Sequence, residues 1–94
     1  MTLSFEWDSR KARSNFVKHS VTFEEATTVF ADPLSLTIYD PQHSLIEQRF
    51  ITMGQTIAEK LLVVAHTDRG DNIRIISARR ASRRERKDYE EKPR

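Results

Sequence analysis

The spacing of apolar residues changes from a helical period to a period of two at Pro33, and this change constrains the fold more than any other feature of the sequence. Before Pro33, apolar residues recur every three to four positions, which predicts helices over residues 9–19 and 23–30. After it, apolar and polar residues alternate or form a short continuous run, as strands do. The four predicted strands cover residues 34–39, 47–53, 60–67 and 72–78. Consecutive strands with short connections favour an antiparallel meander.

The two ends of the chain complete this prediction. Residues 4–7 are expected to form a short first strand, and Asp8 is suited to cap the helix that follows. A last helix follows the meander, capped either by Ser77 or by Ser82 with Glu85 three positions later. The expected fold class is therefore α+β. It has an antiparallel sheet of about four strands plus the short N-terminal strand, two N-terminal helices packed against the sheet, and a basic C-terminal helix.

Residue usage excludes several classes of protein and of site. A chain of 94 residues supports one modest core, so residues 1–94 are expected to form a single domain. Cysteine is absent, which excludes disulfides and thiolate chemistry. The three histidines fall on different predicted elements and the chain has only two glycines, so neither a metal site nor a glycine-rich phosphate loop is expected. The longest apolar run, Leu61–Ala65, is too short for a membrane span, and the N-terminus lacks a secretory signal. We therefore expect a soluble, cytoplasmic protein without a cofactor.

Charge is unevenly distributed along the chain. Residues 1–78 carry eight lysines and arginines against ten aspartates and glutamates, whereas residues 79–94 carry eight against four. A mildly acidic body thus ends in a basic segment. This asymmetry indicates a polyanion or an acidic protein as the partner.

Two arginines in the last predicted strand are candidates for binding a reacting phosphate. Arg74 interrupts an apolar strand, and Arg79 stands where the strand passes into the helix. Arginine suits this task because its planar guanidinium grips phosphate with two hydrogen bonds and stays charged. RNA supplies its own nucleophile, the 2′-hydroxyl, so a protein that cuts RNA needs to position the strand, move protons and stabilise charge. The alternatives are a surface position on an edge strand for Arg74 and pairing with a nearby carboxylate for Arg79.

Proton transfer is assigned to His66 or Glu47. His66 ends the predicted central strand beside a hairpin loop, and Glu47 shares one strand face with Arg49. A structural histidine and an ion pair are the alternatives for these positions. His43, in the loop "DPQHS", either braces that loop or belongs to the site.

The remaining candidates are expected to bind RNA around the reacting phosphate. They are Arg49, Arg80, Arg83, Arg84, Arg86 and Tyr89. Most of the helix arginines also fit a solvent-facing position. Tyr89 either stacks on a base or packs its ring against the sheet, and Glu85 either orients an arginine or caps the helix.

Three stretches of the sequence resemble the BrnT family of bacterial type II toxins. They are "FEWDSRKARSNFVKHSVTFEEATTVFADP", "DPQHSLIEQRF" and "RIISARRASRRERKDYE". The positions that match the family's pattern and carry chemistry are His43, Glu47, Arg49, Arg74, Ser77, Arg79, Glu85 and Tyr89. One departure is Ser20, where the family usually has a glycine that would allow a left-handed helix cap.

The resemblance implies a RelE-like fold and a ribonuclease activity that inhibits translation. It also implies an antitoxin partner of the BrnA type, with a ribbon-helix-helix part. The two proteins would form a heterotetramer of two toxins and two antitoxins that represses its own operon, so operator DNA would be reached only through the antitoxin.

Three hypotheses follow for the function. The leading one is a metal-independent endoribonuclease toxin in which Arg74 and Arg79 neutralise the scissile phosphate. The second is a binding module whose basic helix contacts phosphates without cleavage. The third is a toxin that has lost activity and serves only as a corepressor with its antitoxin.

Overall fold

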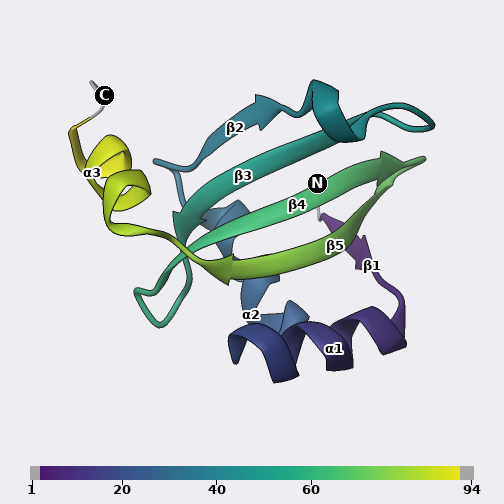
Figure 1. The fold of residues 1–94 in the computed structure, drawn as a ribbon, viewed down its shortest axis with the longest axis horizontal. Helices are drawn as coiled ribbons and strands as arrows, with labels where there is room; N and C mark the ends of the chain where they lie inside the picture. Colours follow the sequence, from purple (N-terminus) through teal and green to yellow (C-terminus); the bar gives the residue numbers. More distant parts are fainter. Residues whose placement is uncertain (1–2, 92–94) are drawn as a thin grey trace.

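The computed structural model describes residues 3–91 and contains a five-stranded sheet with helices at one face and at one end (Figure 1). The strands are β1 Ser4–Glu6, β2 Leu36–Tyr39, β3 Arg49–Gln55, β4 Leu61–Arg69 and β5 Asn72–Arg80. Their order across the sheet is β1-β5-β4-β3-β2. Strands β2 to β5 form the predicted antiparallel meander, and β1 joins β5 in parallel, so the sheet is mixed. The expected α+β class is confirmed.

The helices lie in two places. Helix α1 (Ser9–His19) and helix α2 (Phe23–Thr27), which a 3₁₀ turn (η1, Thr28–Ala31) continues, lie together on one side of the sheet (Figure 1). Helix α3 (Arg83–Glu91) lies apart from them, beyond the end of β5. No helix within residues 3–91 is long and apolar enough to cross a membrane.

The helix ends follow the predicted capping chemistry. The Asp8 carboxylate accepts hydrogen bonds from the backbone N–H groups of Arg10 (2.7 Å) and Lys11 (3.2 Å) at the start of α1. At the other end, Ser20 adopts a left-handed conformation with φ of 58°, and its N–H donates to the Phe16 carbonyl oxygen at 2.8 Å. Serine therefore takes the cap conformation that glycine would adopt at lower cost.

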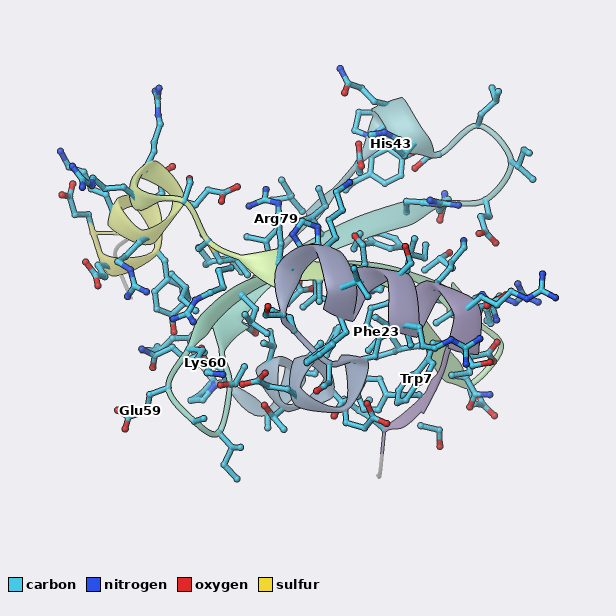
Figure 2. All side chains as sticks on the ribbon, turned by 60° about the horizontal axis from the view of Figure 1, so that its bottom comes forward. Trp7, Phe23, His43, Glu59, Lys60 and Arg79 are labelled. Carbon is cyan, nitrogen blue, oxygen red and sulfur yellow. The ribbon has the colours of Figure 1, made fainter. Side chains whose placement is uncertain are left out.

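The core lies between the two N-terminal helices and one face of the sheet. Its fully buried side chains include Val21, Phe23, Ala26, Val29, Leu62, Val64, Ile75 and Ala78. In Figure 2, the labelled Trp7 and Phe23 lie in the region of α1 and α2, whereas His43 and Arg79 lie above it. Gly54 is required by close packing: a Cβ atom there would meet Val29 Cγ1 at 2.9 Å and Ser35 Cβ at 3.0 Å. The opposite face of the sheet remains open.

A buried side chain of α1 completes the outer edge of β5. Strand β1 pairs with β5 only at residues 72–74. Further along β5, the Asn15 side chain makes the hydrogen bonds that a neighbouring strand would make. Its Nδ2 donates to the Ala78 carbonyl oxygen at 2.8 Å, and the Ala78 N–H donates to Asn15 Oδ1 at 3.0 Å. The same Nδ2 donates to the Val21 carbonyl oxygen at 3.1 Å. One amide therefore ties α1 to the sheet and to the loop that follows the helix.

A β-bulge in β5 shifts the alternation of its side chains between the two faces of the sheet. Ser77 pairs with Ala65 and Ile75 pairs with His66, so Ile76 is an extra residue without a partner in the β4–β5 ladder. Without a bulge, two residues five positions apart in a strand point to opposite faces. The extra residue, Ile76, shifts the alternation of β5 by one position. Arg74 and Arg79 therefore point to the same face, which is the open side of the sheet.

Several predicted boundaries differ from the structure. Strand β3 begins at Arg49, so Glu47 lies in the preceding connection and not on the strand face expected from the sequence. The second strand begins at Leu36 rather than at residue 34, and Ile38 is 61% exposed because it lies on the open face at the edge of the sheet. Strand β4 extends to Arg69 before a turn at Gly70, whose φ is 62°. His66 therefore lies within the strand rather than at its end.

Candidate functional site

A groove of about 230 Å³ crosses the open face of the sheet. Its lining residues are Asp40, His43, Arg49, Ile51, Val63, Ala65, Ile76, Ser77 and Arg79. Alternate residues of β3 and β4 form the apolar floor, because successive strand residues point to opposite faces. Polar and charged groups from the β2–β3 connection, from β3 and from β5 surround this floor. Within residues 3–91, no group of three or more His, Asp or Glu side chains is arranged to hold a metal ion.

An aspartate–histidine pair lies at the rim of the groove. The Nδ1 atom of His43 lies 2.8 Å from Asp40 Oδ2, which leaves Nε2 for a ligand. The loop is fixed at its base, because the Ser44 hydroxyl donates to the Asp40 carbonyl oxygen and accepts from the Arg49 N–H. The sequence interpretation left His43 between a bracing and a site role and did not single out Asp40. The i,i+3 spacing in the turn η2 (Pro41–His43) was the signal for this pair.

Arg79 is held at the groove by Glu85 from the first turn of α3. Its two terminal nitrogens donate to the two Glu85 oxygens at 2.8 and 2.9 Å. This pair raises the pKa of Arg79 and lowers the pKa of Glu85 to about 2. Glu85 also accepts the Ser82 N–H (2.8 Å), while its own N–H donates to Ser82 Oγ (3.1 Å). The predicted second capping box is present, and it orients a charged arginine.

Arg49 brings a second guanidinium to the groove. Its nearest carboxylate is Glu47, at 3.6 Å, a distance too long for a strong hydrogen bond. Its Nε is buried and has no hydrogen-bond partner in the part of the chain that the structure describes. Buried donors normally have acceptors. Arg49 therefore has donor capacity that the protein itself does not use.

Arg74 does not share the groove with Arg79. The Cα partners of the two arginines on β4, Thr67 and Val63, are four residues apart, which corresponds to about 13 Å at roughly 3.3 Å per residue. Arg74 instead donates to Glu6 Oε2 at 2.9 Å, and Asn72 donates to the other oxygen of this carboxylate at 3.1 Å. The expectation that both arginines hold one phosphate does not agree with this geometry.

His66 lies on the face opposite the groove and is 5% exposed. Its Nε2 atom hydrogen-bonds to Thr52 Oγ1 at 2.7 Å, and its ring packs against Phe30 and Phe50 with centroid separations of 4.9 and 6.0 Å. Ala65 points into the groove, and successive strand residues point to opposite faces, so His66 points into the core. The structure therefore separates His66 from the arginines with which the sequence interpretation combined it.

The buried His66 is expected to make the fold sensitive to acid. Burial lowers the pKa of His66 below its ordinary value of 6.5, so the unfolded chain takes up a proton more readily than the folded one. The stability contributed by the neutral ring is complete above about pH 6.5 and is lost as the pH falls through the lowered pKa. Thermal melts should therefore show a smaller drop in Tm between pH 7 and pH 5 for His66→Gln than for the wild type. His19→Gln, at the end of α1, is the control; equal drops in all three proteins would contradict the expectation.

Tyr89 is a structural residue of α3. It is 5% exposed, and its hydroxyl donates to Asp32 Oδ2 at 2.5 Å. The same carboxylate accepts the N–H groups of Leu34 (2.9 Å) and Gln55 (2.8 Å), which ties α3 to the β3 end of the sheet. The buried ring favours the packing alternative for Tyr89 over stacking on a base, and its RNA-binding role has no support from this conformation.

The other basic candidates lie on the surface outside the groove. Arg80, Arg83, Arg84 and Arg86 are exposed. Arg86 approaches Glu90 at 3.7 Å, one turn further along α3. Their proposed contact with flanking RNA remains a prediction.

The chain was also compared with known protein families, sequences and structures. Residues 7–85 match the family model described as "Ribonuclease toxin, BrnT, of type II toxin-antitoxin system". A search of curated protein sequences found no match. Among solved structures, the chain is similar to the crystal structure of the Brucella abortus ribonuclease toxin BrnT. The TM-score is 0.64 at 21% sequence identity, and the match covers 87% of this chain and 100% of that chain. At this identity the structural likeness supports the fold alone.

Proposed function

This chain belongs to the BrnT family of ribonuclease toxins of type II toxin–antitoxin systems, and from that premise we propose that it is a metal-independent endoribonuclease that inhibits translation by cutting RNA on the open face of its sheet. The observation that carries this proposal is the groove in which the Asp40–His43 pair meets two arginines, Arg49 and Arg79. The first pair supplies proton transfer, and the second supplies fixed positive charge.

Cleavage in this groove uses the nucleophile that RNA already contains. The 2′-hydroxyl oxygen attacks the adjacent phosphorus, the bond from phosphorus to the 5′-oxygen of the next nucleotide breaks, and a 2′,3′-cyclic phosphate and a 5′-hydroxyl result. Negative charge grows on the phosphate oxygens during the attack. Arg79 is oriented by Glu85 to face this charge. The Arg49 guanidinium, whose contact with Glu47 is a long 3.6 Å, can donate hydrogen bonds to a phosphate oxygen.

His43 is suited to move the protons of this reaction. Its Nε2 is the nitrogen that Asp40 does not engage, so the Asp40 contact selects the tautomer and orientation of the ring. A histidine in this position takes the proton of the 2′-hydroxyl or gives one to the leaving 5′-oxygen. Ser77 and the apolar floor from Val63 and Ala65 complete the surface on which the scissile nucleotide lies.

The test is RNA cleavage by the purified protein in EDTA. We expect cleavage to persist, with 2′,3′-cyclic phosphate ends, because the reaction draws its nucleophile from RNA and its positive charge from arginine. His43→Ala should lower the rate about 100-fold, the low end for general acid–base catalysis, because water can partly replace a side chain that is 66% exposed.

Two results would contradict the proposal. One is loss of cleavage in EDTA with recovery on adding Mg²⁺. The other is an unchanged rate in His43→Ala. His19→Ala provides the matched control, since it removes a histidine from the end of α1 without touching the groove.

Membership in a type II toxin–antitoxin family implies an antitoxin as partner. We propose that this partner is a BrnA-like ribbon-helix-helix protein in a complex of two toxins and two antitoxins, which contacts operator DNA through the antitoxin. It would neutralise the toxin by covering the groove with acidic and apolar residues. An adjoining hollow of about 210 Å³ supports this, because it is lined by Leu36, Ile38, Ile51, Met53 and Val63 beside the first turns of α3. A complex that leaves Arg79 open to solvent would contradict direct blocking.

A further inference from the structure

A second hollow of about 370 Å³ adjoins the groove and shares His43 and Arg49 with it. Its other lining residues are Leu45, Ile46 and Glu47. Leu45 and Ile46 are both 96% exposed, so two aliphatic side chains project into solvent beside a charged site. Exposed apolar side chains next to polar groups commonly mark a binding surface. We call this hollow, lined by residues 43, 45–47 and 49, the loop hollow.

The chemistry of the loop hollow fits an unpaired nucleobase. A base has two flat apolar faces and a polar edge, and single-stranded RNA is recognised through contacts to both. Leu45 and Ile46 offer apolar contact for a face. Glu47 offers two carboxylate oxygens to an edge. Its ion pair with Arg49 is long, at 3.6 Å, and leaves the acceptor capacity of these oxygens largely unused.

A carboxylate selects among the four bases by their donors. The Watson–Crick edge of guanine presents N1–H and an amino N–H side by side, which match the two oxygens of one carboxylate. Adenine and cytosine each present an amino group next to an acceptor, and uracil presents one N–H between two carbonyl oxygens. The paired donors of guanine therefore give the best match, and uracil the worst.

We propose that the loop hollow is the subsite for a guanine next to the scissile phosphate, and that Glu47 reads its Watson–Crick edge. This inference rests on the proposed cleavage function for the position of the phosphate, because His43 and Arg49 lie between the two hollows. It changes the role of Glu47 from the proton transfer expected from sequence to base recognition.

The experiment maps every cut in a pool of single-stranded RNA of random sequence. The wild type is expected to cut with guanine enriched at one fixed position beside the broken bond. Glu47→Gln should reduce the ratio of kcat/KM for guanine over uracil at that position by roughly 10-fold or more, because an amide cannot accept two hydrogen bonds from neighbouring donors. Glu59→Gln is the control, since this glutamate lies on the turn between β3 and β4, far from His43 in Figure 2.

The apolar part of the loop hollow is tested separately. The double variant Leu45→Ser and Ile46→Ser should raise KM with little change in kcat, because the contacts to a base face bind the ground state and the transition state alike. A direct binding measurement with guanosine 3′-monophosphate and uridine 3′-monophosphate should show the same preference without any cleavage. Glu47→Gln should remove it.

The outcomes separate this inference from the proposed function. Cleavage without a guanine preference, or a preference that Glu47→Gln retains, overturns the subsite and leaves the endoribonuclease proposal standing. Absence of cleavage overturns the proposed function, and the nucleotide-binding preference then decides the subsite by itself. If the Leu45 and Ile46 variants cleave normally but escape neutralisation by the antitoxin, the hollow is a protein contact and the subsite is wrong.

Discussion

Replacing Arg79 with alanine is expected to lower the rate of RNA cleavage roughly 100- to 1,000-fold, the range typical for removing one preorganised group that stabilises transition-state charge. The structure places the Arg79 guanidinium at the groove, where its orientation is fixed by two hydrogen bonds that it donates to Glu85. Glu85 accepts one N–H from each terminal nitrogen, and the Arg80 carbonyl oxygen accepts from Nη1 at 3.3 Å, which leaves the second N–H of Nη2 for a phosphate oxygen. Arg79→Lys keeps the charge but loses the planar fork, so an intermediate rate is expected.

Arg80→Ala is the matched control for this prediction, because loss of a contact to flanking RNA changes binding and not the rate at saturating RNA. It removes the same charge one residue later, and its Cα partner Leu62 is fully buried in the core, so Arg80 takes the face opposite the groove. The measurement is the single-turnover rate at saturating RNA, with thermal melts to show that each variant is folded. A rate in Arg79→Ala above about a third of wild type, or an equal loss in Arg80→Ala, would contradict a role for Arg79 at the scissile phosphate.

Asn15→Ala is expected to destabilise the fold by at least about 3 kcal/mol, because it leaves three buried backbone groups without partners at about 1–3 kcal/mol each. These groups are the N–H and carbonyl of Ala78 and the carbonyl of Val21. Alanine forms helices better than asparagine, which offsets only about half a kcal/mol. For a domain of this size, a loss of 1 kcal/mol lowers Tm by about 4–8 °C, so a drop well above 10 °C is expected in thermal melts.

Two further variants show whether the amide itself is responsible. Ser14→Ala, at an exposed position on the same helix, should leave Tm nearly unchanged. Asn15→Asp keeps an acceptor for the Ala78 N–H but turns a second oxygen towards two carbonyl oxygens, so it should destabilise the fold at least as much as Asn15→Ala. A Tm of Asn15→Ala close to that of Ser14→Ala would show that the bridge between α1 and β5 contributes little.

Much of the fold could be predicted from the sequence because its signals are local. The change of period at Pro33 separates helices from strands, and Asp8, Thr22 and Ser82 cap the helices that follow them. The parallel pairing of β1 was not predictable in this way, since it joins residues 4–6 to residues 72–74. The role of Asn15 was hidden for the same reason: its partner Ala78 is 63 positions away.

The candidate site was predicted less completely than the fold. Arg79 and Arg49 were among the candidates, and both line the groove. The predicted strand over residues 60–67 places His66 near its end, which favours His66 over His43 for proton transfer. Strand alternation within β4 instead points His66 into the core, while a short turn after β2 brings His43 to the groove with Asp40.

The element types, the capping residues and the concentration of positive charge near the C-terminus follow from the amino-acid sequence alone, because each depends on residues close together in the chain. Which of those residues meet in space depends on the folding of the whole chain. The clearest case is the bulge at Ile76: one unpaired residue reverses the alternation of β5, so that Arg74 and Arg79 share the open face. Four residues along β4 still hold the two arginines about 13 Å apart at roughly 3.3 Å per residue, so only Arg79 lies at the groove with His43.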